Sequence, residues 1–105
     1  MAVSNATTEI RTEIPPKAVP DTNREAELIR KVLEGQVEAF SELLTPHFKP
    51  LKGLVRRLVR NEFDSDDIVQ QTVLKAYSRL NQFRFHATFR TWLTAIALNE
   101  IRQNG

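Results

Sequence analysis

Apolar residues recur at helical spacing along most of this chain, and that periodicity restricts the fold more than any other feature of the sequence. Side chains three and four residues apart share one face of a helix, so such a stripe indicates an amphipathic helix. No segment shows the apolar–polar alternation, bounded by turn residues, that predicts a β-hairpin. The sequence therefore predicts an all-α fold. The clearest stripe consists of Leu51, Leu54, Val55, Leu58 and Val59.

We expect a compact bundle of four to five helices, because five segments carry an apolar stripe and short polar breaks separate them. Gly35 is placed to end the first helix. Pro46 and Pro50 are expected to end the second, since a proline inside a helix kinks or stops it. The expected apolar faces are Leu28, Ile29, Val32 and Leu33; Val37, Phe40, Leu43 and Leu44; residues 51–59; Ile68, Val69, Thr72, Val73, Ala76, Tyr77 and Leu80; and Phe89, Trp92, Leu93, Ile96, Ala97 and Ile101.

Two helix starts are expected from capping residues. Residues 61–65 form a polar break in which Asp64 or Ser65 can cap the fourth helix, and Asp66 and Asp67 suit the positive end of its dipole. Thr88 is the expected cap of the last helix.

The chain of 105 residues has room for one domain. Residues 1–21 contain three prolines and no helical periodicity, so we expect a flexible, disordered N-terminal tail. Residues 22–105 are expected to fold. No apolar run approaches the roughly 20 residues of a membrane helix, and no secretory signal is visible, so a cytoplasmic location without membrane insertion is expected.

The sequence gives no reason to expect an enzyme, a cofactor or a metal site. It has no cysteine. His47 and His86 lie far apart and outside any metal-ligand spacing, so a structural or solvated role is favoured for each. Helix capping explains the acidic residues near Asp66 more simply than a cation site does. Only three glycines occur, and none belongs to a phosphate-binding loop.

Two helices have polar faces that suggest binding. A basic set on the third helix is either a solvated face or a site that neutralises phosphates. The fourth helix presents a polar stripe interrupted by one leucine, which could dock on another helix. The basic set is Lys49, Lys52, Arg56, Arg57 and Arg60, and the polar stripe is Asp67, Gln70, Gln71, Leu74 and Ser78.

Residues 81–92 alternate aromatic side chains with arginines and amides. This mixture suits single-stranded nucleic acid, because unpaired bases stack on aromatic rings while arginines hold the backbone. Some of the rings are expected to be core instead, namely Phe83, Phe89 and Trp92. The residues expected to be exposed are Arg84, Phe85, His86 and Arg90.

Three stretches resemble region 2 of the extracytoplasmic-function (ECF) sigma factors of bacterial RNA polymerase. They are DIVQQTVLKAY (67–77), FR (83–84) and TFRTWLTAIALN (88–99). The family pattern is roughly D-[LI]-V-Q-[ED]-x-F-L-[KR]-A-[WY], a short loop opening F-R-G, and F-x-T-W-L-x-x-I-A-x-N. The resemblance covers approximately residues 25–102.

The resemblance implies a transcription initiation factor that binds core RNA polymerase and recognises and melts the promoter −10 element through its non-template strand. It implies that the fourth helix docks on the clamp helices of the largest polymerase subunit. An anti-sigma factor is an expected further partner, and the chain is expected to be a monomer. The implied polymerase contacts are Asp67, Gln70, Gln71, Leu74 and Ser78; the −10 contacts are Arg84, Phe85, His86, Thr88, Arg90, Thr91, Thr94 and Asn99; and the phosphate contacts are Lys52, Arg56, Arg57 and Arg60.

Some positions depart from the family pattern. Gln71 stands where glutamate is usual, which exchanges a charge-assisted contact for a neutral one. Phe85 and His86 replace a glycine and a small polar residue, and Leu98 stands where arginine is frequent. The 105 residues do not include a region 4 domain, so we expect the chain to be a fragment of a longer protein rather than one that acts without that domain. Two alternatives stay open: a sigma-like decoy that binds an anti-sigma factor without DNA, and a general helical protein-interaction domain.

Overall fold

The computed structural model describes residues 22–104, and the predicted tail of residues 1–21 lies outside them. The described part is helical and contains no strand, which confirms the all-α prediction. Its elements are α2 (Thr22–Leu33), α3 (Glu38–Leu58), α4 (Glu62–Ser78), the short 3-10 helix η2 (Leu80–Gln82) and α5 (Phe89–Asn104).

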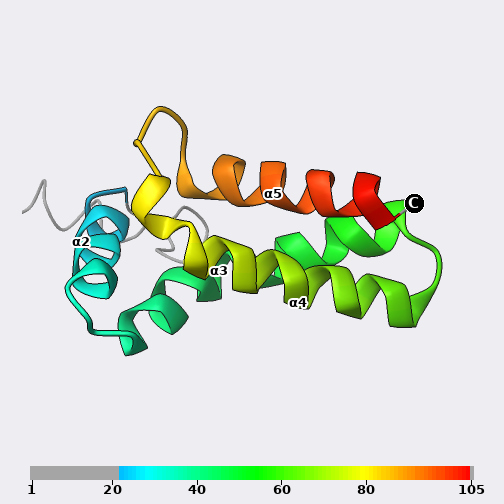
Figure 1. Ribbon diagram of the computed structural model, residues 1–105, viewed down its shortest axis with the longest axis horizontal. Coiled ribbons are helices and arrows are strands. Elements are labelled where there is room, and N and C mark those ends of the chain that lie inside the picture. The colour runs from blue at the N-terminus through cyan, green and yellow to red at the C-terminus, as the bar shows by residue number, and fades with distance from the viewer. Residues whose placement is uncertain (1–21, 105) are drawn as a thin grey trace, which may run out of the picture.

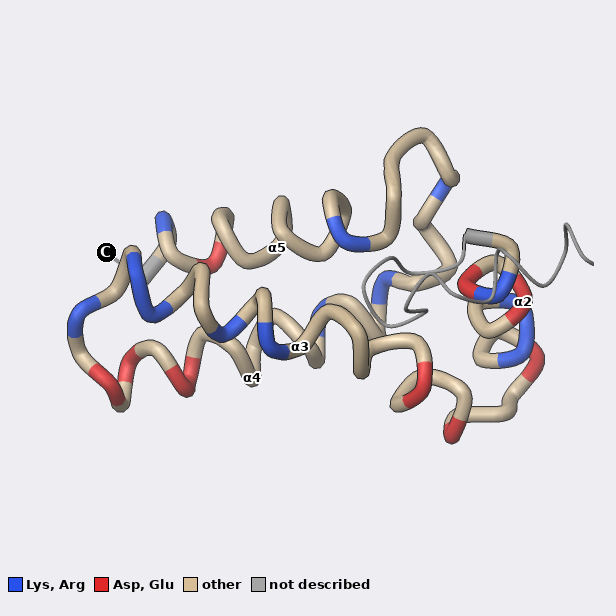
Figure 2. The backbone as a smooth tube through the Cα atoms, turned by 180° about the vertical axis from the view of Figure 1, so that it is seen from behind, with Lys and Arg blue, Asp and Glu red and all other residues tan. Residues whose placement is uncertain are grey.

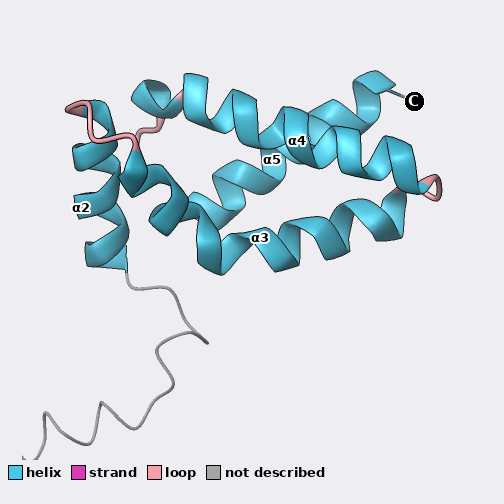
Figure 3. Ribbon diagram, turned by 90° about the horizontal axis from the view of Figure 1, so that it is seen from below, coloured by secondary structure: helices cyan, strands magenta, loops and turns pink. Residues whose placement is uncertain are grey.

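The three long helices lie side by side, and α2 crosses one end of them (Figure 1). Seen from below, α2 stands across the beginning of α3 (Figure 3). Helix α4 packs against both α3 and α5, and α2 packs mainly on α3. None of the described helices is both long and apolar enough to span a membrane.

Helix α2 ends where the sequence predicts, at a glycine in the left-handed region. Gly35 has φ +105°. Its N–H donates to the carbonyl of Val32 (3.0 Å), and the N–H of Gln36 donates to the carbonyl of Lys31 (2.9 Å). This pair of bonds is the Schellman motif, which satisfies carbonyls at the helix end.

Polar contacts join α2 to α3 outside the core. Arg24 Nη2 donates to Glu42 Oε2 (2.5 Å), and Arg24 Nη1 donates to Glu27 Oε1 (3.2 Å). The hydrogen bond to Glu42 is the main reason that the pKa of Arg24 is raised above its usual value.

Helix α3 corrects the prediction that Pro46 and Pro50 end a helix. The second and third predicted helices are one helix of 21 residues with both prolines inside it. Proline has no N–H, so Pro50 leaves the carbonyl of Pro46 without its helical donor. Arg90 Nη2, from α5, donates to that carbonyl at 3.1 Å. A tertiary hydrogen bond thus replaces the one that proline removes.

The start of α4 also differs from the prediction, because neither Asp64 nor Ser65 caps it. Asn61 is the N-cap, and its side-chain oxygen accepts from the N–H groups of Phe63 (2.8 Å) and Asp64 (3.1 Å). Ser65 is fully buried, and its Oγ has no hydrogen-bond partner. The helix therefore begins at Glu62, inside the segment predicted to be a polar break.

The predicted cap of α5 is confirmed. The N–H of Thr91 donates to Thr88 Oγ1 at 3.1 Å. Towards the other end of α5, an ion pair between Lys75 and Glu100 joins α4 to α5, and Glu100 is buried. A buried carboxylate is costly unless it is paired, so this contact fixes the two helices relative to each other.

The core follows the predicted apolar stripes, with exceptions near helix ends. Leu33, Val37 and Leu58 are exposed because they lie at the ends of α2 and α3, where no neighbouring helix covers them. Tyr77 is also exposed at one side, although its ring packs edge-on against Phe40 at 5.2 Å. The buried core consists of Leu28, Ile29, Val32, Ala39, Phe40, Leu43, Leu51, Val55, Ile68, Val69, Ala76, Leu80, Phe83, Phe89, Leu93, Ile96 and Ala97.

The loop between η2 and α5 contains a strained residue. Phe85 has φ +62° and is the one non-glycine residue with positive φ among residues 22–104. A side chain in this left-handed region costs about 1–2 kcal/mol. Glycine avoids that cost, and glycine is usual here in the pattern that the sequence resembles.

Replacing Phe85 separates this strain from the ring's own contribution. Phe85→Ala and Phe85→Gly both remove the ring, but only glycine relieves the backbone. We expect Phe85→Gly to be more stable than Phe85→Ala by about 1 kcal/mol in urea unfolding, although glycine gains chain entropy when unfolded. Equal stability, or a more stable alanine variant, would contradict the positive φ.

Candidate functional site

The segment 83–88, which we call the recognition loop, stands off from the helices at one end of the bundle (Figure 1). The side chains of Arg84, Phe85 and His86 are exposed, as predicted, and 55% of Phe85 is accessible. The loop thus offers a ring, a cation and an imidazole to solvent together.

An aromatic cluster supports the ring of Phe85 from below. Its centroid lies 4.7 Å from that of Phe83, which is buried. Phe83 in turn contacts Phe89 at 6.1 Å and Trp92 at 5.3 Å. The prediction that these three rings belong to the core is confirmed: Phe83 and Phe89 are buried, and Trp92 packs against the core. The ring of Phe85 is therefore exposed to solvent on one side and contacts the buried aromatic cluster on the other.

Arg90 differs from the residues of the recognition loop, because its guanidinium group is turned towards α3. Arg90 Nε donates to His47 Nδ1 at 3.1 Å, and Nη2 donates to the carbonyl of Pro46. The side chain of Arg90 is exposed, as predicted, but two of its donor nitrogens are bonded to α3. Part of its guanidinium group is therefore engaged within the protein, unlike that of Arg84.

Of the other predicted −10 contacts, Thr88 ends the recognition loop, and Thr91 and Thr94 follow it on α5. Thr88 Oγ1 donates to Thr91 Oγ1 at 3.0 Å. Thr94 follows three residues later, on the same side of α5. Asn99 lies five residues beyond Thr94, which places it on a different side of the helix. Thr94 and Asn99 are both half-buried.

The predicted phosphate contacts do not join the recognition loop. Three of them belong to the second half of α3, and Arg60 lies in the α3–α4 turn that follows, at the opposite end of the bundle (Figures 1 and 2). They also differ among themselves. The Lys52 ammonium lies over the ring of Phe48 at 5.7 Å, and Arg56 lies 3.7 Å from Glu62. Arg57 and Arg60 are exposed.

The polar stripe of α4 is exposed along its whole length, as predicted. Its members recur at intervals of three and four residues, so they share one face of the helix. The apolar member, Leu74, is 57% exposed. We call this surface the α4 face; it consists of Asp67, Gln70, Gln71, Leu74 and Ser78.

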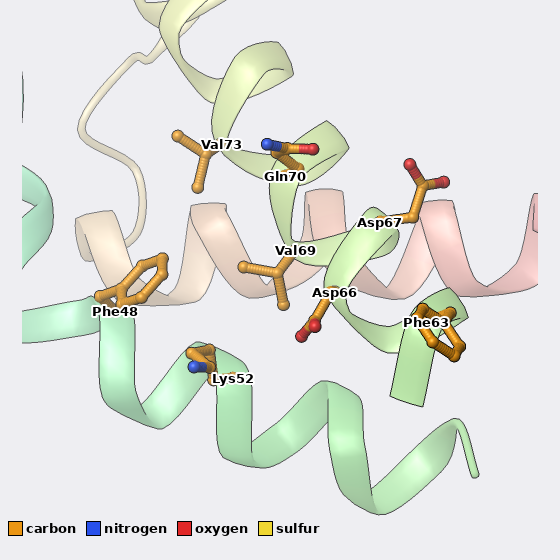
Figure 4. Close-up of a pocket in the computed structure, with 8 residues that line it drawn as sticks. All are labelled: Phe48, Lys52, Phe63, Asp66, Asp67, Val69, Gln70 and Val73. Carbon is orange, nitrogen blue, oxygen red and sulfur yellow. The ribbon is translucent and has the colours of Figure 1, made fainter. Parts of the chain in front are cut away.

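A groove between α3 and α4 borders the α4 face and shares Asp67 and Gln70 with it (Figure 4). Phe63 stands at one end and is 86% exposed, while Phe48 contributes a partly exposed ring from α3. Sequence reasoning missed this groove, because Phe63 fell in a predicted polar break. A lone aromatic residue in such a break was the available signal. The groove is lined by Phe48, Lys52, Phe63, Asp66, Asp67, Val69, Gln70 and Val73.

Known proteins with similar sequences are sigma factors. The chain is 31% identical over 81 residues to the RNA polymerase sigma-H factor of Pseudomonas aeruginosa, covering 77% of this chain and 42% of that protein. It is 38% identical over 72 residues to the ECF RNA polymerase sigma-E factor of Escherichia coli K12, covering 69% and 37%. The chain therefore spans about two fifths of the length of these relatives.

A solved structure and a family match agree with these relatives. The NMR structure of an engineered region 2 of sigmaE in complex with GTAAAA is similar at a TM-score of 0.68 and 32% identity, over 76% of this chain and 83% of that one. Residues 43–104 match the family Sigma-70 region 2. This chain, with its α3–α4–α5 bundle and exposed loop, belongs to the sigma-70 region 2 family and resembles its ECF members.

Proposed function

We propose that this chain is the part of a sigma factor that binds core RNA polymerase and opens the promoter −10 element. The observation that carries the proposal is the exposed ring of Phe85, seated on the buried aromatic cluster beside Arg84. The engineered sigmaE region 2, which resembles this chain over most of its length, is in complex with GTAAAA. The proposed role requires no enzymatic activity of the chain itself.

The recognition loop suits an unpaired base better than a duplex. A base that leaves the duplex loses stacking and pairing worth a few kcal/mol. Stacking on an aromatic side chain returns about 1–3 kcal/mol, and Arg84 supplies a charge for the adjacent phosphate. The contact with Phe83 matters here, because a ring that is already held in place loses less conformational freedom when a nucleotide base stacks on it.

The α4 face and the adjoining groove suit a helical partner. Asp66 and Asp67 offer negative charge to a basic helix, while Leu74 and the two exposed rings offer apolar contact. We propose that the clamp helices of the largest polymerase subunit dock here. Gln71 would make a neutral hydrogen bond where other family members have a charged one.

The two surfaces also argue against a decoy that never touches DNA. A decoy would need the helical scaffold and the α4 face, but not an exposed, strained aromatic residue beside an arginine. The recognition loop keeps both features. An anti-sigma factor that covered the α4 face would compete with polymerase for the same side chains.

The DNA proposal is tested with a fluorescently labelled single strand containing GTAAAA. Phe85→Ala should weaken binding about 5- to 150-fold, which corresponds to about 1–3 kcal/mol of lost stacking. Arg84→Ala should weaken binding and reduce the slope of log K against log salt by about 0.7, the value for one phosphate contact to a single strand. Fluorescence anisotropy at several salt concentrations measures both effects.

Phe63→Ala is the matched control, because it also removes an exposed ring, but from the groove. It should bind the strand as the wild type does. Wild-type affinity in both Phe85→Ala and Arg84→Ala would exclude the recognition loop as the DNA site.

The polymerase proposal predicts the reverse pattern. Phe63→Ala and Asp67→Ala should each lower the affinity for purified bacterial core polymerase at least fivefold, which corresponds to the loss of about 1 kcal/mol that marks an energetically important interface residue. Phe85→Ala should leave that affinity unchanged. Surface plasmon resonance with immobilised core enzyme provides the measurement. If neither α4 variant binds more weakly, polymerase docks elsewhere.

A further inference from the structure

A chain of hydrogen-bonded side chains, Glu25–His47–Arg90, connects α2, α3 and α5, and we call it the relay. Glu25 of α2 is 8% exposed, and His47 of α3 is 2% exposed. Glu25 Oε2 lies 2.5 Å from His47 Nε2, and Arg90 Nε donates to the other ring nitrogen, Nδ1, at 3.1 Å. The α2–α3 and α3–α5 contacts therefore meet at a single imidazole ring.

The hydrogen bonds determine which nitrogen of His47 carries the proton. An arginine side chain can only donate, so Nδ1 must accept with its lone pair. The ring proton is then on Nε2, which donates to the Glu25 carboxylate. The imidazole is neutral in this arrangement and joins a carboxylate to a guanidinium group of opposite charge. Each of the three side chains has the donor or acceptor that its neighbour requires.

The relay ties the first turn of α5 to α3. Arg90 lies in the first turn of α5, next to the buried Phe89 and two residues after the cap, Thr88. The ring of His47 also contacts that of Phe89 at 5.3 Å. Arg90 adds the bond to the Pro46 carbonyl, so the first turn of α5 is tied to α3 by a side-chain and a backbone acceptor.

We propose that Glu25 and His47 are positioning residues for DNA recognition, because they hold Arg90 in place. In this proposal Arg90 bonds to α3 and positions the end of the recognition loop, and it does not contact phosphate. Glu25 and His47 are buried, so they influence a strand only by fixing the end of the recognition loop. This inference rests on the proposed function of the loop. It replaces the sequence-based expectation that Arg90 binds the −10 element.

The test compares Glu25→Ala, His47→Ala and Arg90→Ala in binding to the strand containing GTAAAA. Each variant should bind about tenfold more weakly, because the loop must then be ordered on binding. The salt slope should stay at the wild-type value, since no phosphate contact is lost. The double variant His47→Ala/Arg90→Ala should bind no more weakly than either single variant, because the residues act as one unit.

Two controls separate positioning from other roles. Affinity for core polymerase, which we assign to the α4 face, should stay within about twofold, whereas a general loss of folded protein would lower both affinities. Arg90→Lys keeps the charge but loses the planar fork, so it should not restore DNA binding. A reduced salt slope in Arg90→Ala, with rescue by lysine, would show that Arg90 contacts phosphate and would overturn the proposal.

Amide hydrogen exchange tests the relay without DNA. The N–H groups of Thr91 and Trp92 are bonded to Thr88 at the start of α5. They should exchange faster in Glu25→Ala and His47→Ala, while amides in the middle of α4 keep wild-type rates. Unchanged exchange at both residues would overturn the relay. Failure of the wild type to bind any strand would instead overturn the proposed function, with the relay still judged by exchange.

Discussion

The guanidinium group of Arg90 supplies the interaction on which the rest of this structure depends. It donates to a backbone carbonyl that a proline has left unpaired, and to a histidine that is held in turn by a glutamate. Helix α3 can therefore continue through Pro50 without leaving the Pro46 carbonyl unpaired. The same guanidinium group belongs to the first turn of α5, so these contacts join the start of α5 to α3 next to the recognition loop.

The recognition loop combines an aromatic support from the core with an unfavourable backbone conformation at Phe85. Phe85 keeps a conformation suited to glycine but carries a large exposed ring, which Phe83 supports from the core. Strained residues persist where the surrounding structure over-determines them, and they are common at functional sites. Here the ring of Phe85 contacts the buried ring of Phe83, which supplies part of that constraint. The loop carries an aromatic ring where glycine is usual in the pattern that the sequence resembles.

Periodicity and capping rules predicted the helices, the stop at Gly35 and the start of α5 at Thr88, because these depend on neighbours within a few residues. The continuity of α3 could not be predicted in that way. The rule that proline ends a helix is local, whereas the donor that offsets it comes from residue 90. The same limit applies to Arg90: spacing shows that an arginine follows the aromatic run, but not that two of its nitrogens are bonded to α3.

The exposure of the α4 face and of residues 84–86 was predictable, but their surroundings were not. The groove beside Phe63 exists because Asn61 starts α4 earlier than the sequence indicates, and that shift brings the ring onto the helix. The basic residues of α3 were predicted as one set, yet two of them contact Phe48 and Glu62. Side-chain partners of this kind depend on helix packing.

We propose that DNA and polymerase use separate surfaces, with an unpaired base on the recognition loop. An NMR titration of the chain with the single strand containing GTAAAA tests it most directly. We expect chemical-shift changes concentrated at residues 83–88 and at Thr91, with little change at Phe63, Gln70 or Leu74. Changes concentrated in the α3–α4 groove, with residues 83–88 unaffected, would contradict it.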